Sequence, residues 1–238
     1  MQVKAVLFDL FNTLVLLESD EVFYPPSLGR LHAFLVRKDV DIPFEDFRRV
    51  YFEVRSELYA ETEKSLEEPH FNVRVSRVLR RFGYDFDASS AIVAGATRAF
   101  AEEFERYVHL DNDALDVLGK LREKYRLGLV SNFPIPECAL ELLHKFGLKK
   151  FFDVTLVSGA INKRKPSSEI FERALKVLGV NASEAVFVGD MLDLDVKGSK
   201  NVGMKAVLIK RRSSGKILNV TPDIVVKSLR ELLHVLNC

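Results

Sequence analysis

The chain has 238 residues, of which 47% are hydrophobic and 29% charged, and its formal net charge is +1. This length and composition allow a sizeable buried core, and they exclude disordered, collagen-like and low-complexity proteins. An even charge balance provides no global attraction to nucleic acid or to an anionic membrane, so we expect neither as a partner. Cys138 and Cys238 do not form a C-x-x-C arrangement or a disulfide framework, which predicts a reducing, cytoplasmic setting.

The N-terminal stretch 1–17 is apolar, but Lys4, Asp9 and Asn12 interrupt it and it lacks a small-residue cleavage site. We therefore expect no signal peptide. No run in the chain reaches the ~18 unbroken apolar residues of a membrane span. Residues 3–8 form a near-continuous aliphatic run, which predicts a strand covered on both faces.

The middle of the chain has a helical pattern and no convincing strand between residues 24 and 107. Amphipathic segments predict helices over 27–37, 44–66, 72–82 and 89–104, separated at Pro25-Pro26, 41–43 and 83–85. The acidic run 57–68 is interpreted as a solvated helix face. Most aromatic side chains here are expected to pack between helices, with Phe23 and Tyr24 as candidates for contact with a ligand.

From about residue 109 onward, apolar runs alternate with helical patterns. Strands are predicted over 127–130, 154–157, 185–188, 206–209 and 224–226, and helices over 113–124, 136–146, 168–178, 193–202 and 229–236. The alternation predicts an α/β fold with a parallel, doubly wound sheet. Because the sheet needs the strand at 3–8, the helical block 17–107 is an insertion into a core made of 1–16 and 108–238. We expect the block to lie over the carboxyl end of the first strand, where ligands bind in open α/β sheets.

Polar side chains follow several of these predicted strands. Asp9 follows the first, Ser131 and Asn132 end the second, Asp190 follows the strand at 185–188, and Lys165 precedes that strand. An ordinary turn explains any one of them alone. Their recurrence predicts that they converge at the carboxyl edge of the sheet.

These motifs, taken in order, resemble the haloacid dehalogenase-like superfamily, and the resemblance covers the whole chain. The matching elements are D-x-x-x-T-L at 9–14, Ser131 at a strand end, the pair Lys165-Pro166, and G-D-x-x-x-x-D as Gly189, Asp190 and Asp195. The resemblance implies a Rossmann-like core, a small α-helical cap made by the inserted block, and a covalent aspartyl intermediate on Asp9. It also implies that Thr13, Ser131 and Asn132 bind the substrate.

The chemistry of a strand-end carboxylate supports this interpretation. A carboxylate is a feeble nucleophile in water, but in near-attack geometry beside cations it can displace an alcohol from phosphorus or a halide from carbon. Asp9 is the candidate nucleophile. Lys165 would supply a positive charge, although it also belongs to a basic cluster at 163–165 that could be solvated surface. Ser131 and nearby backbone amides could hold phosphate oxygens.

A hard divalent cation is predicted beside Asp9 and Asp190. Both are oxygen ligands with no His or Cys cluster nearby, which favours Mg²⁺. By resemblance, the backbone carbonyl at Phe11 would be a further ligand, and Asp195 would either bind the metal or orient Lys165. Asp193 is interpreted as an acid at a helix start.

Phe11 departs from the pattern of most phosphatases in the family, which carry an aspartate two residues after the nucleophile as general acid and base. Phe cannot transfer a proton, so a contribution of roughly 10²–10⁴-fold is missing or comes from elsewhere. An aromatic residue there resembles the haloacid dehalogenases, for which Arg30 is a conceivable halide ligand. Asp190 with Asp195, however, keeps charge for a cation that a dehalogenase does not require.

The leading hypothesis is therefore a cytoplasmic, Mg²⁺-dependent phosphatase, a hydrolase that cleaves a small phosphate monoester through a phospho-aspartyl intermediate on Asp9. The alternative is a metal-independent 2-haloacid dehalogenase with the same nucleophile. A third hypothesis, motivated by Phe11, is a non-catalytic protein that keeps the fold and binds a protein partner. Neither the substrate nor the oligomeric state follows from the sequence.

Overall fold

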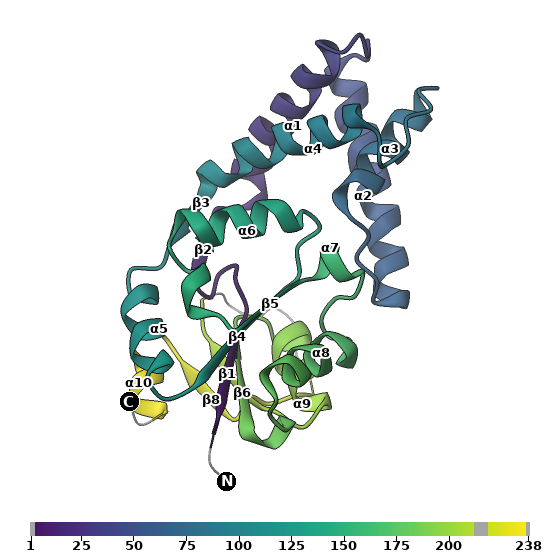
Figure 1. Ribbon diagram of the computed structural model, residues 1–238. Coiled ribbons are helices and arrows are strands. Elements are labelled where there is room, and N and C mark those ends of the chain that lie inside the picture. The colour runs from purple at the N-terminus through teal and green to yellow at the C-terminus, as the bar shows by residue number, and fades with distance from the viewer. Residues whose placement is uncertain (1–2, 212–218, 237–238) are drawn as a thin grey trace.

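The computed structural model, which describes residues 3–211 and 219–236, contains a six-stranded parallel sheet in the lower half of the molecule as drawn in Figure 1. The strand order is β5-β4-β1-β6-β7-β8. The strands are β1 (Ala5–Phe8), β4 (Arg126–Ser131), β5 (Val154–Val157), β6 (Ala185–Gly189), β7 (Lys205–Ile209) and β8 (Ile224–Val226). The predicted α/β class is confirmed, and a strand forms at each of the six predicted places.

Helices cover both faces of the sheet. They are α5 (Ala114–Arg122), α6 (Pro136–Lys145), α7 (Ser158–Ile161), α8 (Ser168–Leu178), α9 (Lys197–Asn201) and α10 (Glu231–Val235), with short 3₁₀ turns η1 (Glu105–Tyr107), η2 (Lys149–Phe151) and η3 (Ala182–Glu184). Side chains of β1 alternate between the faces. Val6 and Phe8 join the apolar cluster that contains residues of α5, α6 and α10, whereas Ala5 and Leu7 join the cluster of α8.

Strand β1 lies in the middle of the sheet, and this position places Asp9. Phe8 is aligned with Leu129 of β4 and Val188 of β6, so the next residue emerges at the carboxyl edge between two neighbouring strands. All four residues of β1 are fully buried. Because β1 is apolar and buried on both faces, the polar residue Asp9 comes directly after its last residue, at the carboxyl edge of the sheet.

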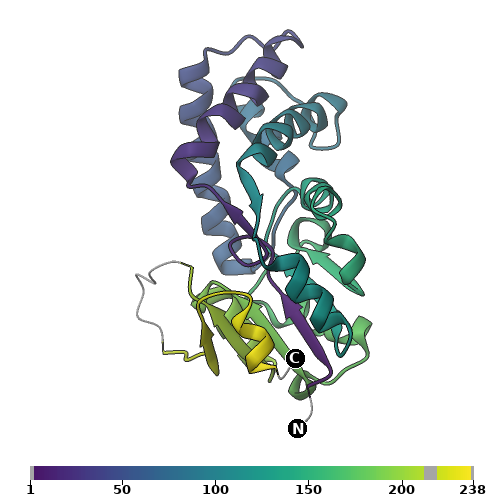
Figure 2. The same cartoon turned by 90° about the vertical axis from the view of Figure 1, so that its left-hand side faces the viewer.

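The inserted helices form a separate layer beyond this edge (Figures 1 and 2). They are α1 (Asp20–Val36), α2 (Phe44–Ser65), α3 (Phe71–Arg81) and α4 (Ala91–Phe104). An antiparallel pair of short strands, β2 (Val15–Leu17) and β3 (Val108–Leu110), carries the chain into and out of the layer. The sequence did not predict this pair, because two three-residue strands show no periodicity of their own and depend on each other. The exact division into a core (1–16 and 108–238) and a cap domain (17–107) stays a prediction.

Two local predictions are wrong. Helix α1 begins at Asp20 and continues through Pro25 and Pro26, which the sequence pattern predicts to separate helices. The carbonyls that lose their partners belong to the exposed residues Glu21 and Val22, so water can satisfy them. The predicted helix over 193–202 is instead a π-helical turn, η4 (Leu192–Val196), followed by α9.

None of the helices in residues 3–211 and 219–236 combines the length and the hydrophobicity that a membrane span requires. Cys138 is a buried free thiol, and burial raises its pKa. Cys238 lies outside the described residues.

Candidate active site

Three charged side chains from distant parts of the sequence meet at the carboxyl edge of β1. The Lys165 ammonium donates to Asp9 Oδ1 at 2.6 Å and to Asp195 Oδ1 at 2.7 Å. The exposed fractions are 7% for Asp9, 2% for Lys165 and 2% for Asp195. A buried cation between two carboxylates is a satisfied arrangement, since each charge has an opposite partner at hydrogen-bond distance.

Asn132 fixes the segment that carries Lys165. Its side-chain Oδ1 accepts from the Lys165 amide at 2.8 Å, and its Nδ2 donates to the Lys165 carbonyl at 3.0 Å. Both ends of the Asn132 amide are therefore used on one peptide segment. The structure gives Asn132 a positioning contact that the sequence did not suggest, while its predicted contact with substrate stays a prediction.

Asp195 is held from its second oxygen as well. Its Oδ2 accepts from the Met191 amide at 2.9 Å, within the π-helical turn η4. The turn passes so close to the end of β6 that a Cβ on Gly189 would lie 2.3 Å from Asp195 Oδ2. π-Turns are rare and occur often at functional sites. Here the turn and Gly189 together let Asp195 reach Lys165.

Asp190 completes a cluster of acids with ligand geometry. One oxygen each from Asp9, Asp190 and Asp195 lie within 4.8 Å of one another. Three carboxylates and the Lys165 ammonium carry a formal charge of −2, and a hard divalent cation would neutralise it. The oxygen donors fit Mg²⁺. Asp193 is not part of this cluster of described residues, in keeping with its interpretation as a helix-start acid.

At this site, burial and the neighbouring opposite charges shift the pKa values of Asp9 and Lys165 in opposite directions. The pKa of Asp9 is raised to about 6, mainly because burial disfavours the charged form; the Lys165 ammonium lowers the pKa, and the negative charge of Asp195 raises it. For Lys165, burial by itself would lower the pKa, but Asp195 and Asp9 outweigh it and the pKa is raised. Lys165 therefore remains an ammonium ion at neutral pH, and Asp9 depends on cations nearby to remain a carboxylate.

Four buried hydroxyls lack a hydrogen-bond partner among residues 3–211 and 219–236, and two of them lie at the carboxyl edge of the sheet. These two are Thr13 Oγ1, in the loop after β1, and Ser131 Oγ, at the end of the neighbouring strand β4. Both residues are fully buried. A buried hydroxyl without a partner is uncommon and calls for a ligand or an ordered water. These are two of the three residues for which the resemblance implies substrate binding.

Phe11 lies at the boundary between this cluster and a neighbouring pocket. Its ring packs on Phe133 with centroids 4.8 Å apart, and on Phe104 with centroids 6.0 Å apart. Both of those rings line the pocket. The side chain two residues after Asp9 is thus part of an apolar wall and cannot exchange a proton.

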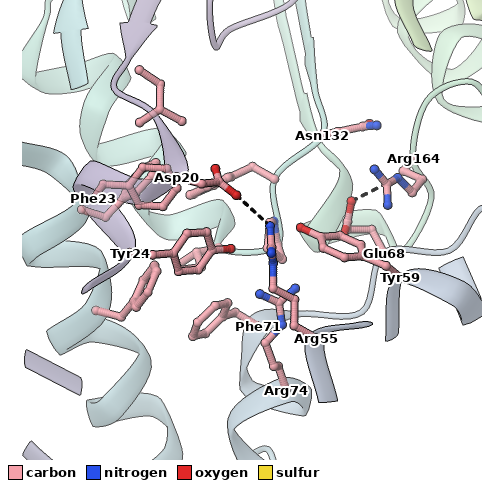
Figure 3. A pocket seen from close by; sticks show the side chains of 16 residues that line it. Asp20, Phe23, Tyr24, Arg55, Tyr59, Glu68, Phe71, Arg74, Asn132 and Arg164 are labelled. Carbon is pink, nitrogen blue, oxygen red and sulfur yellow. Dashed lines mark hydrogen bonds and ion pairs between the residues drawn. The ribbon is translucent and has the colours of Figure 1, made fainter. Parts of the chain in front are cut away.

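The pocket itself has a volume of about 170 Å³ and lies between the helical block and the loops that follow β4 and precede α8 (Figure 3). Its lining residues are Leu17, Asp20, Phe23, Tyr24, Arg55, Tyr59, Glu68, Phe71, Arg74, Phe100, Phe104, Asn132, Phe133, Pro134, Ile135 and Arg164. Asp9 and Lys165 are not among them, but Asn132 touches both the pocket and the Lys165 backbone. The pocket therefore adjoins the charged cluster.

This lining tests several predictions about the helical block. Phe23 and Tyr24 line the pocket, as expected. Arg30 does not: its side chain is 58% exposed and lies 3.7 Å from Glu103, so the expectation that it could hold a halide is wrong. Arg55 and Arg74 meet here instead. No sequence pattern predicts this, because their approach depends on how α2 and α3 pack.

Glu68 also differs from expectation. The acidic run 57–68 is predicted to be a solvated face, and Glu57 and Glu61 are indeed exposed and paired with arginines. Glu68 is only 5% exposed, and its Oε2 lies 3.4 Å from both Arg164 Nε and Ser158 Oγ. Burial raises the pKa of Glu68. The helix ends before Glu68, so helical periodicity no longer decides where that side chain points.

Comparison with known proteins agrees with the geometry. The sequence model of the haloacid dehalogenase-like hydrolase family matches residues 3–203. The chain belongs to this family. It is therefore a hydrolase, and the Rossmann-like core and ordered motifs are those of a haloacid dehalogenase-like protein.

Individual relatives of this haloacid dehalogenase-like hydrolase point mainly to phosphatases. It is 31% identical to a glyceraldehyde 3-phosphate phosphatase from Methanopyrus kandleri, over 98% of this chain and 97% of that protein. Among solved structures it is similar to a HAD phosphatase from Thermococcus onnurineus, with a TM-score of 0.68, 30% identity and 98% of each chain covered. A 2-haloacid dehalogenase from Pseudomonas syringae has a TM-score of 0.77, 24% identity and 99% coverage of each chain, which shows a shared fold.

Proposed function

We propose that this hydrolase is a Mg²⁺-dependent phosphatase that cleaves a small phosphate monoester through a phospho-aspartyl intermediate on Asp9. The observation that carries the proposal is the contact of the buried Lys165 ammonium with Asp9 and Asp195, within a cluster that includes Asp190. The phosphatases among its relatives support the same reaction class. A cytoplasmic location stays a prediction.

In the proposed first step, a carboxylate oxygen of Asp9 attacks the phosphorus atom. The new bond from Asp9 oxygen to phosphorus forms as the bond from phosphorus to the alcohol oxygen breaks, and the alcohol oxygen leaves with the electron pair. In the second step, water attacks the same phosphorus as the bond from Asp9 oxygen to phosphorus breaks, so that phosphate leaves and the Asp9 carboxylate is restored. Solvent water protonates the departing alkoxide and takes up the proton that the attacking water loses. Lys165 keeps Asp9 charged, and Thr13 and Ser131 are available to donate to phosphate oxygens.

Asp9, Asp190, Asp195 and the backbone carbonyl of Phe11 would hold the Mg²⁺ ion. When bound, the ion supplies positive charge that offsets the repulsion between the carboxylates and an anionic phosphate ester. The helical block would act as the cap, closing the pocket over the substrate and excluding water. These assignments combine the carboxylate cluster with the position of the pocket above it.

The direct test is turnover of a chromogenic aryl phosphate by Asp9→Asn protein. The amide is nearly the same size but is not a nucleophile, so we expect activity to fall by on the order of 10⁴-fold or more. Asp193→Asn is the matched control, since Asp193 is an aspartate that follows the neighbouring strand β6 but lies outside the acid cluster, and it should keep near-normal turnover. Full activity of the Asp9→Asn protein would refute the assignment.

Phe11 favours a second candidate, the metal-independent 2-haloacid dehalogenase, because a halide leaves without needing a proton. In that reaction Asp9 would attack carbon and release the halide. Chloride release from 2-chloropropionate in excess EDTA, together with no hydrolysis of phosphate esters, would decide for it. The position of Arg30 outside the pocket and the presence of Asp190 in the acid cluster favour the phosphatase.

A further inference from the structure

More arginine than carboxylate side chains line the pocket beside the charged cluster. Arg55, Arg74 and Arg164 line it together with Asp20 and Glu68. Arg55 lies 2.9 Å from Asp20, and Arg164 lies 3.4 Å from Glu68 (Figure 3). Three arginines against two carboxylates leave a formal charge of +1 in a cavity of about 170 Å³.

Arg74 carries that excess charge. It is 5% exposed, and its one hydrogen bond among the described residues goes from Nη1 to the Tyr51 hydroxyl at 3.0 Å. No carboxylate in the described part of the chain lies within ion-pair distance of it, and its Nε is buried without a partner. A buried guanidinium that no carboxylate contacts directly is costly, because it has lost its water and gains only the longer-range attraction of Glu68.

Aromatic rings hold both guanidinium groups of the helical block in place. The Arg55 guanidinium carbon lies 4.8 Å from the ring centroid of Tyr24 and 4.9 Å from that of Tyr59. The Arg74 guanidinium carbon lies 5.1 Å from the ring centroid of Phe71. The Nε of Arg55 is also buried without an acceptor. Stacked guanidinium groups with unused donors form a rigid fork that matches a planar carboxylate.

We propose that the pocket is a carboxylate subsite, in which Arg74 and Arg55 bind the carboxylate of a phosphorylated small organic acid whose phosphate lies at Asp9. This inference rests on the proposed phosphatase function and names its substrate class. A single excess positive charge matches a carboxylate better than a second, doubly charged phosphate. A cavity near 150 Å³ holds a molecule the size of benzene, so the acid is a small one.

The test compares two esters that differ at one carbon, 3-phosphoglycerate and glycerol 3-phosphate. The first ends in a carboxylate and the second in a neutral hydroxymethyl group. We expect wild-type protein with Mg²⁺ to prefer 3-phosphoglycerate by about tenfold or more in kcat/KM, since hydrogen bonds between charged groups differ by that much from neutral ones. The preference should appear mainly in KM, because the contact is remote from the reacting phosphorus.

Arg74→Gln should bring the ratio of the two kcat/KM values close to one, and Arg74→Lys should restore part of it. Arg77→Gln is the matched control, because Arg77 lies on the same helix but pairs with Glu61 and does not line the pocket. That control should keep the wild-type ratio. If Arg74→Gln does not fold, the less buried Arg55→Gln should show the same loss of preference.

Binding to Asp9→Asn protein, measured by calorimetry, separates failure of this inference from failure of the proposed function. If wild type hydrolyses neither these two esters nor an aryl phosphate, the phosphatase proposal fails, and tighter binding of 3-phosphoglycerate that is lost on adding Arg74→Gln still supports the subsite. Equal affinity for the two esters, or an equal loss of both in the Arg74 variant, would overturn it. Propane-1,3-diol bisphosphate carries a second phosphate in place of the carboxylate. If it binds more tightly than 3-phosphoglycerate, the subsite prefers a phosphate, and the choice of a carboxylate is overturned.

Discussion

Asp195 illustrates how one residue in the site depends on the absence of a side chain elsewhere. Its two oxygens accept from Lys165 and from the Met191 amide, and Gly189 leaves the space it occupies. Lys165 in turn reaches Asp9 from the segment that Asn132 holds. The carboxylate cluster is therefore positioned by contacts that extend well beyond the four charged residues.

Gly189→Ala is expected to disable the site and to lower the free energy of unfolding by about 1–3 kcal/mol, because the new side chain overpacks the buried Asp195. The new Cβ would lie 2.3 Å from Asp195 Oδ2, so the carboxylate must move, and displacement of about 1 Å can reduce turnover about 10²-fold. Aryl phosphatase activity and the melting temperature are the measurements. Gly119→Ala, within α5, meets nothing within 4 Å and should keep full activity with slightly higher stability. Unchanged activity in Gly189→Ala would contradict the packing argument.

Phe11→Asp should supply the proton donor that the wild-type chain lacks. Alkyl phosphates have poor leaving groups and need a proton more than aryl phosphates do, so the ratio of alkyl to aryl turnover should rise roughly tenfold or more. Phe11→Asn is the control, because it also removes the ring that contacts Phe133 and Phe104 but cannot act as an acid. The same ratio in both variants would show that the missing acid does not limit the reaction.

At the scale of elements, Asp153 connects three parts of the core beside the sheet edge opposite β8. Asp153 pairs with Arg122 at the end of α5, and its Oδ2 accepts from the Leu127 amide of β4 at 3.0 Å. The chain then enters β5 directly. Hydrogen bonds from Arg122 lower the pKa of Asp153, and the Leu127 amide lowers it further, against the opposing effect of burial.

This lowered pKa predicts the pH dependence of an Asp153→Asn variant. Because the folded-state pKa lies below the unfolded value near 4, Asp153 stabilises the protein above about pH 4, and this contribution is lost as the pH falls through the folded-state pKa. Urea titrations should show the variant less stable by about 1–2 kcal/mol at pH 7, with the difference shrinking below pH 4. Asp116→Asn, an exposed acid on α5, should change little. A difference that is constant from pH 7 to pH 3 would contradict the assignment.

At the scale of the whole molecule, the helical block touches the core close to the site. The Phe71 amide donates to the Pro134 carbonyl at 2.8 Å, and the Arg164 amide donates to the Leu66 carbonyl at 3.0 Å. His70 lies 3.0 Å from Glu137 of α6. The segment between α2 and α3 thus contacts the loops that carry Asn132 and Lys165. Movement of the helical block would therefore shift these loops and the charged cluster.

Local sequence pattern was enough to predict the sheet and the residues at its carboxyl edge. Buried strands appear as apolar runs, so the places of the strand-end residues Asp9, Ser131 and Asp190 follow from the pattern. The features that local pattern could not predict depend on packing between helices. Arg74 and Glu68 look like charged residues of a solvated block, yet both are 5% exposed. Their burial is set by the crossing of elements and not by periodicity.

The central claim is that Asp9 becomes covalently phosphorylated, and rapid acid quench with peptide mass spectrometry tests it most directly. Protein with Mg²⁺ is mixed with excess p-nitrophenyl phosphate, quenched during steady turnover and digested with pepsin. We predict a phosphoryl group on the peptide that contains Asp9, absent from Asp9→Asn protein and present in Asp193→Asn protein. Continued turnover with no phosphoryl group on that peptide, or with the group on another residue, would contradict the account.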